Sequence, residues 1–378
     1  MDERIEFWGL YSVCQVFLLA ALVVKPSPNR WSLFIPIIFL TIYLLFFTST
    51  GNLTRDDIVG SVMLAYLFTA TDYILLTDVQ RELRLQGQKG PISDASLLSR
   101  LQWGLKLFTS PRGVGWAHEV PHLPARPRHS SRTAFVFLQL AWMGVYALAY
   151  DLIGIFSRWN FSCLHQNACF THIAWLWRIR VLFGFMGSAY SMTCIMFCIV
   201  SILSVVSHAS EPKDWPPLYG RWVEAYTLRR FWSRTWHQLL RRSLSSHAEF
   251  IAHRVFGLAR GTRLSAYVQL YSAFFISGMI HHGGEYMMFK HWGGSGMRFF
   301  LAQPVAIMLE DLVIQAWSNG RKADKPCAVL RLLGCIWVAS WFTMTLNPVI
   351  CAQMLEEGMQ FSIVLGLRSG NWFPTVVR

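Results

Sequence analysis

Long apolar runs constrain the fold of this chain more than any other feature. Eight segments of mostly apolar residues alternate with polar stretches, and about 20 residues of helix suffice to cross a bilayer core. Since 53% of the residues are hydrophobic and only 15% are charged, a soluble globule is excluded. The predicted spans are residues 7–24, 31–48, 58–76, 134–153, 180–206, 264–283, 298–317 and 328–346.

A ninth apolar run, near 349–366, is interrupted by Glu356 and Glu357. We therefore predict an all-α, polytopic transmembrane bundle of eight or nine spans. The whole chain, 1–378, forms a single membrane domain in this interpretation.

Two long polar loops set the predicted orientation. Loop 77–133 holds nine Lys or Arg residues against four acids, and loop 207–263 holds ten against four. Cytosolic loops carry such an excess of basic residues, so both loops are placed in the cytosol and the 154–179 loop in the lumen. Within the second loop, 221–242 interleaves Trp and Phe with Arg, which predicts an amphipathic helix in the membrane interface.

The formal net charge of +13 is distributed over these loops. No compact basic domain appears, so we predict contact with lipid head groups and not with nucleic acid.

The predicted lumenal loops carry the two N-glycosylation sequons, at Asn52 and Asn160. Cys163 and Cys169 share a loop with Asn160, and either a disulfide or two free thiols is compatible with that compartment. The sequence contains no CxxC pair that would favour structural zinc.

A pair of histidines lies at the end of an apolar run, in FISGMIHH from Phe275 to His282. A polar side chain at that depth is costly unless it is paired or used. On a helix, Ser277 and His281 share one face, whereas His282 points about 100° away. The residues alone allow two interpretations of His281, a packing or interfacial histidine and a catalytic one.

A second motif, FWSRTWH at 231–237, precedes FISGMIHH by some forty residues. The two together resemble the signature of the membrane-bound O-acyltransferases. The wax-synthase-like branch of that family, with its FWxRxWHQ and SGxxHE-type motifs, is the most similar. It includes fungal terpenoid and meroterpenoid O-acetyltransferases. The resemblance is strong over 215–320, and it extends to the N-terminal half only through the pattern of spans.

The resemblance implies roles for residues of both motifs. His281 takes the place of the catalytic histidine, and His237 that of a second polar residue. The family pattern has an acid directly after the histidine, but this chain has His282 there and Glu285 one turn further on. The candidate substrate-binding residues are Trp236, Gln238, Ser277, Arg234 and Glu310.

The chemistry of acyl transfer accounts for these residue types. An attacking alcohol must lose its proton, and a neutral imidazole is the usual base near pH 7. A second polar group can orient that base or the thioester carbonyl as charge develops. The basic loops would attract the phosphates of coenzyme A.

We therefore expect an O-acyltransferase of the endoplasmic reticulum membrane with no bound cofactor or metal. Acyl-CoA is the expected co-substrate, acetyl-CoA in first place. The expected acceptor is a hydroxyl of a lipophilic terpenoid-type metabolite, and a wax-ester synthase acting on a long-chain alcohol is the alternative.

Other classes fit less well. A di-iron desaturase needs several histidine boxes, and only His118 and His122 give the HxxxH spacing. The HHxxxD motif of soluble acyltransferases fails because Tyr286 replaces the acid. A transporter would show related halves, which the uneven spacing of spans does not favour.

Overall fold

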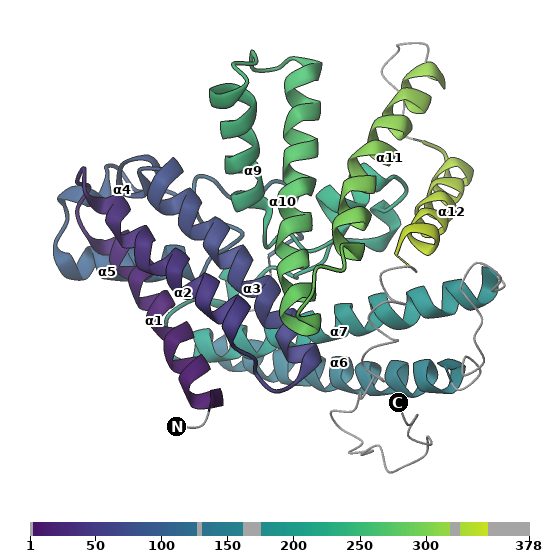
Figure 1. Cartoon of the computed structure of the whole chain (residues 1–378), viewed down its shortest axis with the longest axis horizontal. Coiled ribbons are helices and arrows are strands. Elements are labelled where there is room, and N and C mark those ends of the chain that lie inside the picture. The colour runs from purple at the N-terminus through teal and green to yellow at the C-terminus, as the bar shows by residue number, and fades with distance from the viewer. Residues whose placement is uncertain (1–2, 127–130, 162–174, 318–325, 347–378) are drawn as a thin grey trace. The chain divides into compact units, whose positions relative to one another are not determined.

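The computed structural model describes residues 3–126, 131–161, 175–317 and 326–346. Every element longer than a single turn in this part of the chain is a helix, and its only strand-type pairing is one bridge between Leu85 and Trp116. Figure 1 shows these helices along the chain. The prediction of an all-α fold is confirmed.

A helix lies over most of each of the eight predicted spans. These helices are α1 (Glu3–Val23), α2 (Phe34–Phe47), α3 (Leu53–Thr71), α6 (Arg132–Phe161), α7 (Trp175–Val206), α10 (Arg263–Phe289), α11 (Ser295–Trp317) and α12 (Ala328–Thr345).

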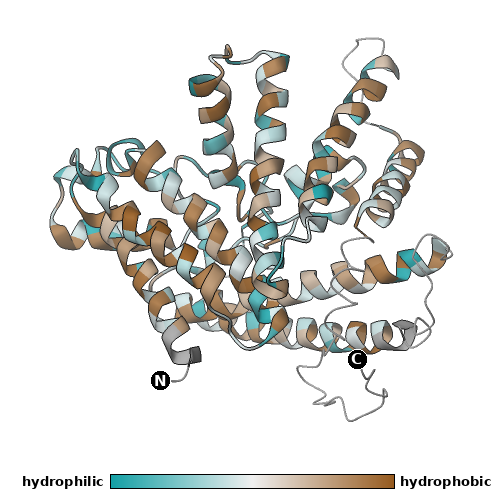
Figure 2. Ribbon diagram, in the orientation of Figure 1, coloured by the Kyte–Doolittle hydropathy of each residue, from teal (hydrophilic) through white to brown (hydrophobic). Residues whose placement is uncertain are grey.

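Among the described residues, six helical segments are long and apolar enough to cross a membrane. Apolar residues run along most of the helices in Figure 2, and many large ones are exposed, such as Phe39, Phe47 and Trp317. Exposed aromatic and aliphatic side chains in this number are typical of lipid-facing helices. The chain is therefore a multi-pass membrane protein, while the number of spans stays a prediction, and 349–366 lies outside the described residues.

Contacts divide the chain into two compact units. One is formed from Met1–Leu123 with Tyr219–Cys335, and the other from Pro124–Leu218 with Ile336–Arg378. We retain the single membrane domain as a prediction.

The first unit has α10 at its centre, packed against α3 and α11. Close helix approach depends on glycine here, because a Cβ on Gly60 of α3 would lie 2.8 Å from the carbonyl oxygen of Gly283. Small residues such as these glycines let membrane helices pack closely without hydrophobic driving force.

Helices α1, α2 and α3 bury an apolar cluster that includes Leu22, Ile37 and Trp103 of α5 (Leu97–Phe108).

The second unit contains α6 and α7, which pack as an antiparallel pair. Tyr150 and Ile195 lie in its buried cluster. The Arg132 side chain at the start of α6 donates to the carbonyl oxygen of Val205 at 2.9 Å, at the end of α7.

The interfacial helix predicted over 221–242 is wrong as a continuous element. The segment contains a 3-10 turn (Trp222–Glu224), the one-turn helix α8 (Leu228–Arg230) and a π turn, η8 (Phe231–Thr235). Helix α9 (Arg241–Phe250) begins only at its end. Tertiary contacts, described below, override the amphipathic pattern.

Candidate active site

Helix α10 carries the first candidate residue, His281. The helix begins at the Thr262 cap, whose Oγ1 accepts from the backbone N–H of Ser265 at 3.2 Å. It continues to Phe289, beyond the predicted end at residue 283, so His281 lies well inside the helix. Glycine allows α10 to lie close to α11 here, because a Cβ on Gly278 would lie 2.7 Å from the Met297 sulfur of α11.

The imidazole of His281 stacks on the ring of Phe300 from α11. The ring centroids are 4.6 Å apart and the planes differ by 11°. The histidine is half-buried. Imidazole nitrogens donate and accept hydrogen bonds in the plane of the ring, and an aromatic ring stacked on one face restricts the orientation of that plane.

The neighbouring His282 has a different environment, as the helical spacing predicts. Its Nδ1 lies 3.1 Å from Oε2 of Glu285, and its ring lies against Trp292 with centroids 4.7 Å apart. Glu285 is buried, and its Oε1 accepts from Ser295 Oγ at 2.7 Å and from the Gly296 N–H at 2.6 Å. The acid one turn after His281 therefore pairs with His282 and with the start of α11.

The second candidate, His237, follows the π turn. Its ring packs against Trp236 and Tyr219, with centroids 5.4 and 6.0 Å away. Its Nδ1 is buried and has no hydrogen-bond partner in the described part of the chain. Burial lowers the pKa of His237 to about 4, with further contributions from the charges of His281 and Arg112. His237 is thus a neutral imidazole at pH 7 that lies within electrostatic reach of His281.

The turn that carries His237 is fixed by its own backbone. The Trp236 N–H donates to the carbonyl oxygen of Phe231 at 2.8 Å, which closes the π turn. Gln238, which is buried, donates through Nε2 to the carbonyl oxygens of Trp232 and Trp236 at 2.9 and 2.8 Å. The amide of Gln238 therefore stabilises this turn.

Trp232 connects the two motifs through α11. Its ring contacts Phe274 of α10 and Phe300, with centroids 5.6 and 6.1 Å away. Its Nε1 donates to Oε1 of the buried Gln303 at 3.4 Å. Because Phe300 also stacks on His281, α11 contacts both histidine-bearing segments. Sequence reasoning missed Phe300 and Gln303; the only available signal was an amide inside an apolar run.

The remaining candidate substrate-binding residues lie in different surroundings. Ser277 is buried one turn before His281. Arg234 forms an ion pair with Glu224, with Nη1 and Oε2 3.8 Å apart. Glu310 accepts two backbone hydrogen bonds from α8.

Each of the two polar loops contributes a buried or half-buried arginine, Arg112 or Arg241. Arg112, from the irregular segment after α5, is buried, and burial lowers its pKa to about 10, so it remains charged at pH 7. Arg241 at the start of α9 is half-buried, which lowers its pKa from the ordinary value. Positive charge close to His237 suits an anionic substrate.

The structure describes the two predicted glycosylation sites but not the two predicted lumenal cysteines. Asn52 caps α3, because its Oδ1 accepts from the Arg55 N–H at 2.9 Å. Asn160 lies in the last turns of α6. Cys163 and Cys169 lie outside the described residues, so their pairing stays open.

Comparison with known proteins identifies the relatives of this chain. Residues 215–302, which contain both histidine motifs, match the model of the membrane bound O-acyl transferase family. The acetyltransferase ple2 of Rhodocybe pseudopiperita is 37% identical over 95% of each chain. The acetyltransferase eriL of Hericium erinaceus is 34% identical over 96% of each chain. An O-mevalon transferase, yanI of Aspergillus niger, is 31% identical over 71% of this chain and 64% of its own length.

Proposed function

Since the chain belongs to the membrane-bound O-acyltransferase family and is a membrane O-acyltransferase, we propose that it transfers an acetyl group from acetyl-CoA to a hydroxyl of a lipophilic terpenoid-type metabolite. Its membrane helices, its acyl donor and its alcohol acceptor follow from the family. We propose four further points: that the transferred group is acetyl, that its donor is the thioester acetyl-CoA, that the acceptor is a terpenoid-type alcohol, and that the protein resides in the endoplasmic reticulum. The names of the two relatives with nearly full-length matches support the acetyl group.

The observation that carries the proposal is the pair of histidines. His281 and His237 come from segments that are distant in sequence, and Phe300 of α11 joins these segments, because its ring stacks on His281 and lies beside Trp232 of the His237 segment. An aromatic ring packs against each imidazole, Phe300 against His281 and Trp236 against His237. A low-polarity site of this kind keeps imidazole in its neutral form, which is the form that can accept a proton.

In the proposed reaction, His281 is the general base. Its imidazole takes the proton of the acceptor hydroxyl as the oxygen attacks the thioester carbonyl carbon. The tetrahedral intermediate then collapses with cleavage of the carbon–sulfur bond. The imidazolium of His281 returns the proton to the departing thiolate, so the products are the ester and free coenzyme A.

His237 has the complementary role. Its buried Nδ1 has no partner among the described residues, and a buried polar atom without a partner is costly unless a ligand supplies one. In the tautomer protonated at Nδ1, this atom donates a hydrogen bond to the thioester carbonyl, where negative charge develops. The neutral state of His237 permits that tautomer at pH 7.

The rings of Trp232, Phe274 and Phe299 favour an apolar acceptor near the histidines. The same rings are compatible with a long-chain alcohol, which leaves wax-ester synthesis as the second candidate. One relative named for transfer of a mevalon group indicates that acyl groups differ within the family.

The test uses microsomes that contain the full chain, radiolabelled acyl-CoAs of increasing length and a panel of lipophilic alcohols. We expect acetyl transfer that His281→Ala abolishes and His237→Ala reduces at least 100-fold, in line with the magnitude of general acid–base and oxyanion effects. The matched control is His291→Ala, because His291 is exposed between α10 and α11. Retained transfer in His281→Ala would refute the assignment of the base, and a preference for long acyl chains would select the wax-ester alternative.

A further inference from the structure

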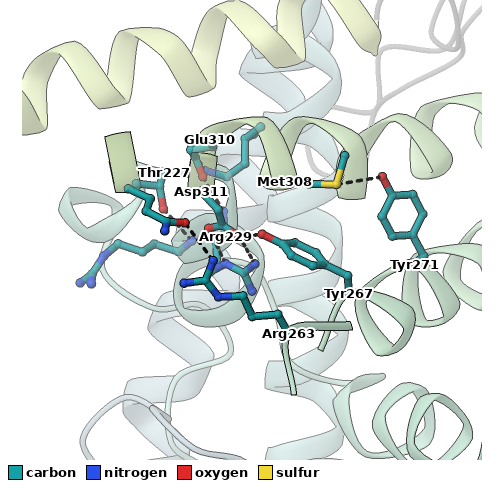
Figure 3. A network of polar contacts seen from close by, with 11 residues as sticks. Thr227, Arg229, Arg263, Tyr267, Tyr271, Met308, Glu310 and Asp311 are labelled. Carbon is teal, nitrogen blue, oxygen red and sulfur yellow. Dashed lines mark hydrogen bonds and ion pairs between the residues drawn. The ribbon is translucent and has the colours of Figure 1, made fainter. Parts of the chain in front are cut away.

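Two adjacent acids, Glu310 and Asp311, lie in the apolar helix α11. Glu310 is buried, with 9% of its surface exposed. Carboxylates on a membrane helix are costly unless their charge is compensated. Groups of α8 and α10 compensate these charges, in the network shown in Figure 3.

Glu310 binds the start of α8 through both carboxylate oxygens. Oε1 accepts from the Leu228 N–H at 2.9 Å, and Oε2 accepts from the Arg229 N–H at 3.3 Å. The Thr227 hydroxyl accepts from the Arg230 N–H at 3.1 Å. The first amides of a helix have no partner within the helix, so Glu310 supplies an acceptor that a single turn cannot provide for itself.

Asp311 fixes the same turn through its side chain. Arg229 donates from Nε to Oδ1 at 3.1 Å and from Nη2 to Oδ2 at 2.5 Å. The Tyr267 hydroxyl of α10 donates to Oδ2 at 3.2 Å. A bidentate arginine–carboxylate pair defines both distance and direction, so α8, α10 and α11 are held in one arrangement at this point.

Helix α8 leads directly into the segment that carries His237. Arg230 is followed by the π turn Phe231–Thr235, and His237 comes two residues later. The end of the π turn has its own hydrogen bond, because Gly220 donates its N–H to the carbonyl oxygen of Thr235 at 2.9 Å. The Trp232 Nε1–H donates a hydrogen bond to Oε1 of Gln303 in α11 at 3.4 Å. Contacts with Glu310 and Gln303 therefore connect the His237 segment to α11, the helix whose Phe300 lies on His281.

We propose that Glu310, reinforced by Asp311, is a positioning residue that holds His237 in register with His281. The proposal rests on the proposed function, since it assumes that both histidines act in one reaction. It also replaces the expectation that Glu310 binds substrate, because both of its oxygens already accept hydrogen bonds from the backbone.

The first test compares turnover in Glu310→Ala and Glu310→Gln. We expect kcat to fall at least 30-fold in Glu310→Ala, with KM for acyl-CoA and for the alcohol changed less than two-fold. Glu310→Gln should recover part of the lost kcat, because its Oε1 can still accept a hydrogen bond from one of the two backbone N–H groups. The matched control is Glu249→Gln, because Glu249 is an exposed acid on α9 and should leave both constants unchanged.

Two outcomes of this test would overturn the proposal. A large rise in KM with little change in kcat would assign Glu310 to substrate binding. An unchanged kcat per folded molecule, with a smaller folded fraction by size-exclusion chromatography, would leave Glu310 a purely structural role.

A second measurement does not depend on activity. In a His237→Cys background, the rate at which iodoacetamide alkylates position 237 reports how firmly the segment is held. Glu310→Ala should raise this rate at least five-fold, while Glu249→Gln should not. An unchanged rate would overturn the positioning role even if the wild-type chain transferred acyl groups, and an increased rate in a chain without transferase activity would refute only the proposed function.

Discussion

The imidazole of His281 lies flat on the ring of Phe300, with the two planes 11° apart. Phe300 also lies beside Trp232 of the other motif. One phenylalanine therefore touches both segments that carry the candidate histidines. Sequence patterns gave no reason to single it out among 27 phenylalanines.

Removing this ring should slow transfer without unfolding the protein. In Phe300→Leu the apolar bulk is largely kept, but the stacking against His281 is lost. Aromatic pairs contribute about 0.5–1.5 kcal/mol beyond their buried area, so we expect kcat to fall about 3- to 10-fold. Leu309→Ala is the control, because Leu309 is an exposed residue of the same helix. Equal rates for Phe300→Leu and the wild type would show that ring stacking does not orient the histidine.

The close packing of α10 on α3 should make Gly284 intolerant of a larger side chain. A Cβ on Gly284 would collide with the Asp57 carbonyl oxygen and with the Ser61 hydroxyl. Overpacking of this kind costs about 1–3 kcal/mol, so Gly284→Ala should lower the Tm of the detergent-solubilised protein. Gly144→Ala is the control, because a Cβ there meets nothing within 4 Å and alanine favours the helix. The same Tm for both variants would argue against close contact between α3 and α10.

The lowered pKa of His237 predicts how stability responds to acid. The pKa falls from its ordinary value of 6.5 to about 4 in the folded chain, so between these values the unfolded chain binds more protons. The contribution of His237 is therefore fully present above about pH 6.5 and is lost as the pH falls toward 4. We expect His237→Asn to lose less Tm than the wild type between pH 7 and pH 5. A larger loss in the variant would show that His237 is not buried in its neutral form.

The ion pair between Asp72 and Arg242 should be essential for stability. Asp72 is fully buried, Arg242 Nε lies 3.0 Å from its Oδ2, and the Thr77 hydroxyl donates to Oδ1 at 2.8 Å. Removing one partner of a buried pair costs about 3–5 kcal/mol, because the other charge is left uncompensated. Arg242→Met should therefore reduce the yield of folded protein strongly.

The double variant Asp72→Asn with Arg242→Met provides the matching control. It removes both charges, so we expect it to be more stable than Arg242→Met alone. Chromatographic yield and Tm in detergent measure both. If the double variant were no more stable than the single one, the loss would come from packing of the arginine side chain instead of its charge.

The amino-acid sequence by itself determined the class of fold and the two motifs. Apolar runs of span length allow only helices in lipid, because every backbone group must be satisfied within the segment. The helices therefore follow the predicted spans, although α10 extends to Phe289. The helical period also separated His281 from His282 correctly, since their directions depend only on local geometry.

The tertiary structure alone decided what surrounds those residues. The segment 221–242 has the pattern of an amphipathic helix, yet Glu310 of α11 binds its backbone amides and Gln303 of α11 binds the Trp232 side chain, so a turn replaces the helix. The acid after His281 could not be assigned from spacing, because its partners, Ser295 and Gly296, belong to the next helix. Period and composition report the preferences of single elements. The contacts that orient His237 and His281 join elements distant in the chain, and only the packing of α8, α10 and α11 defines them.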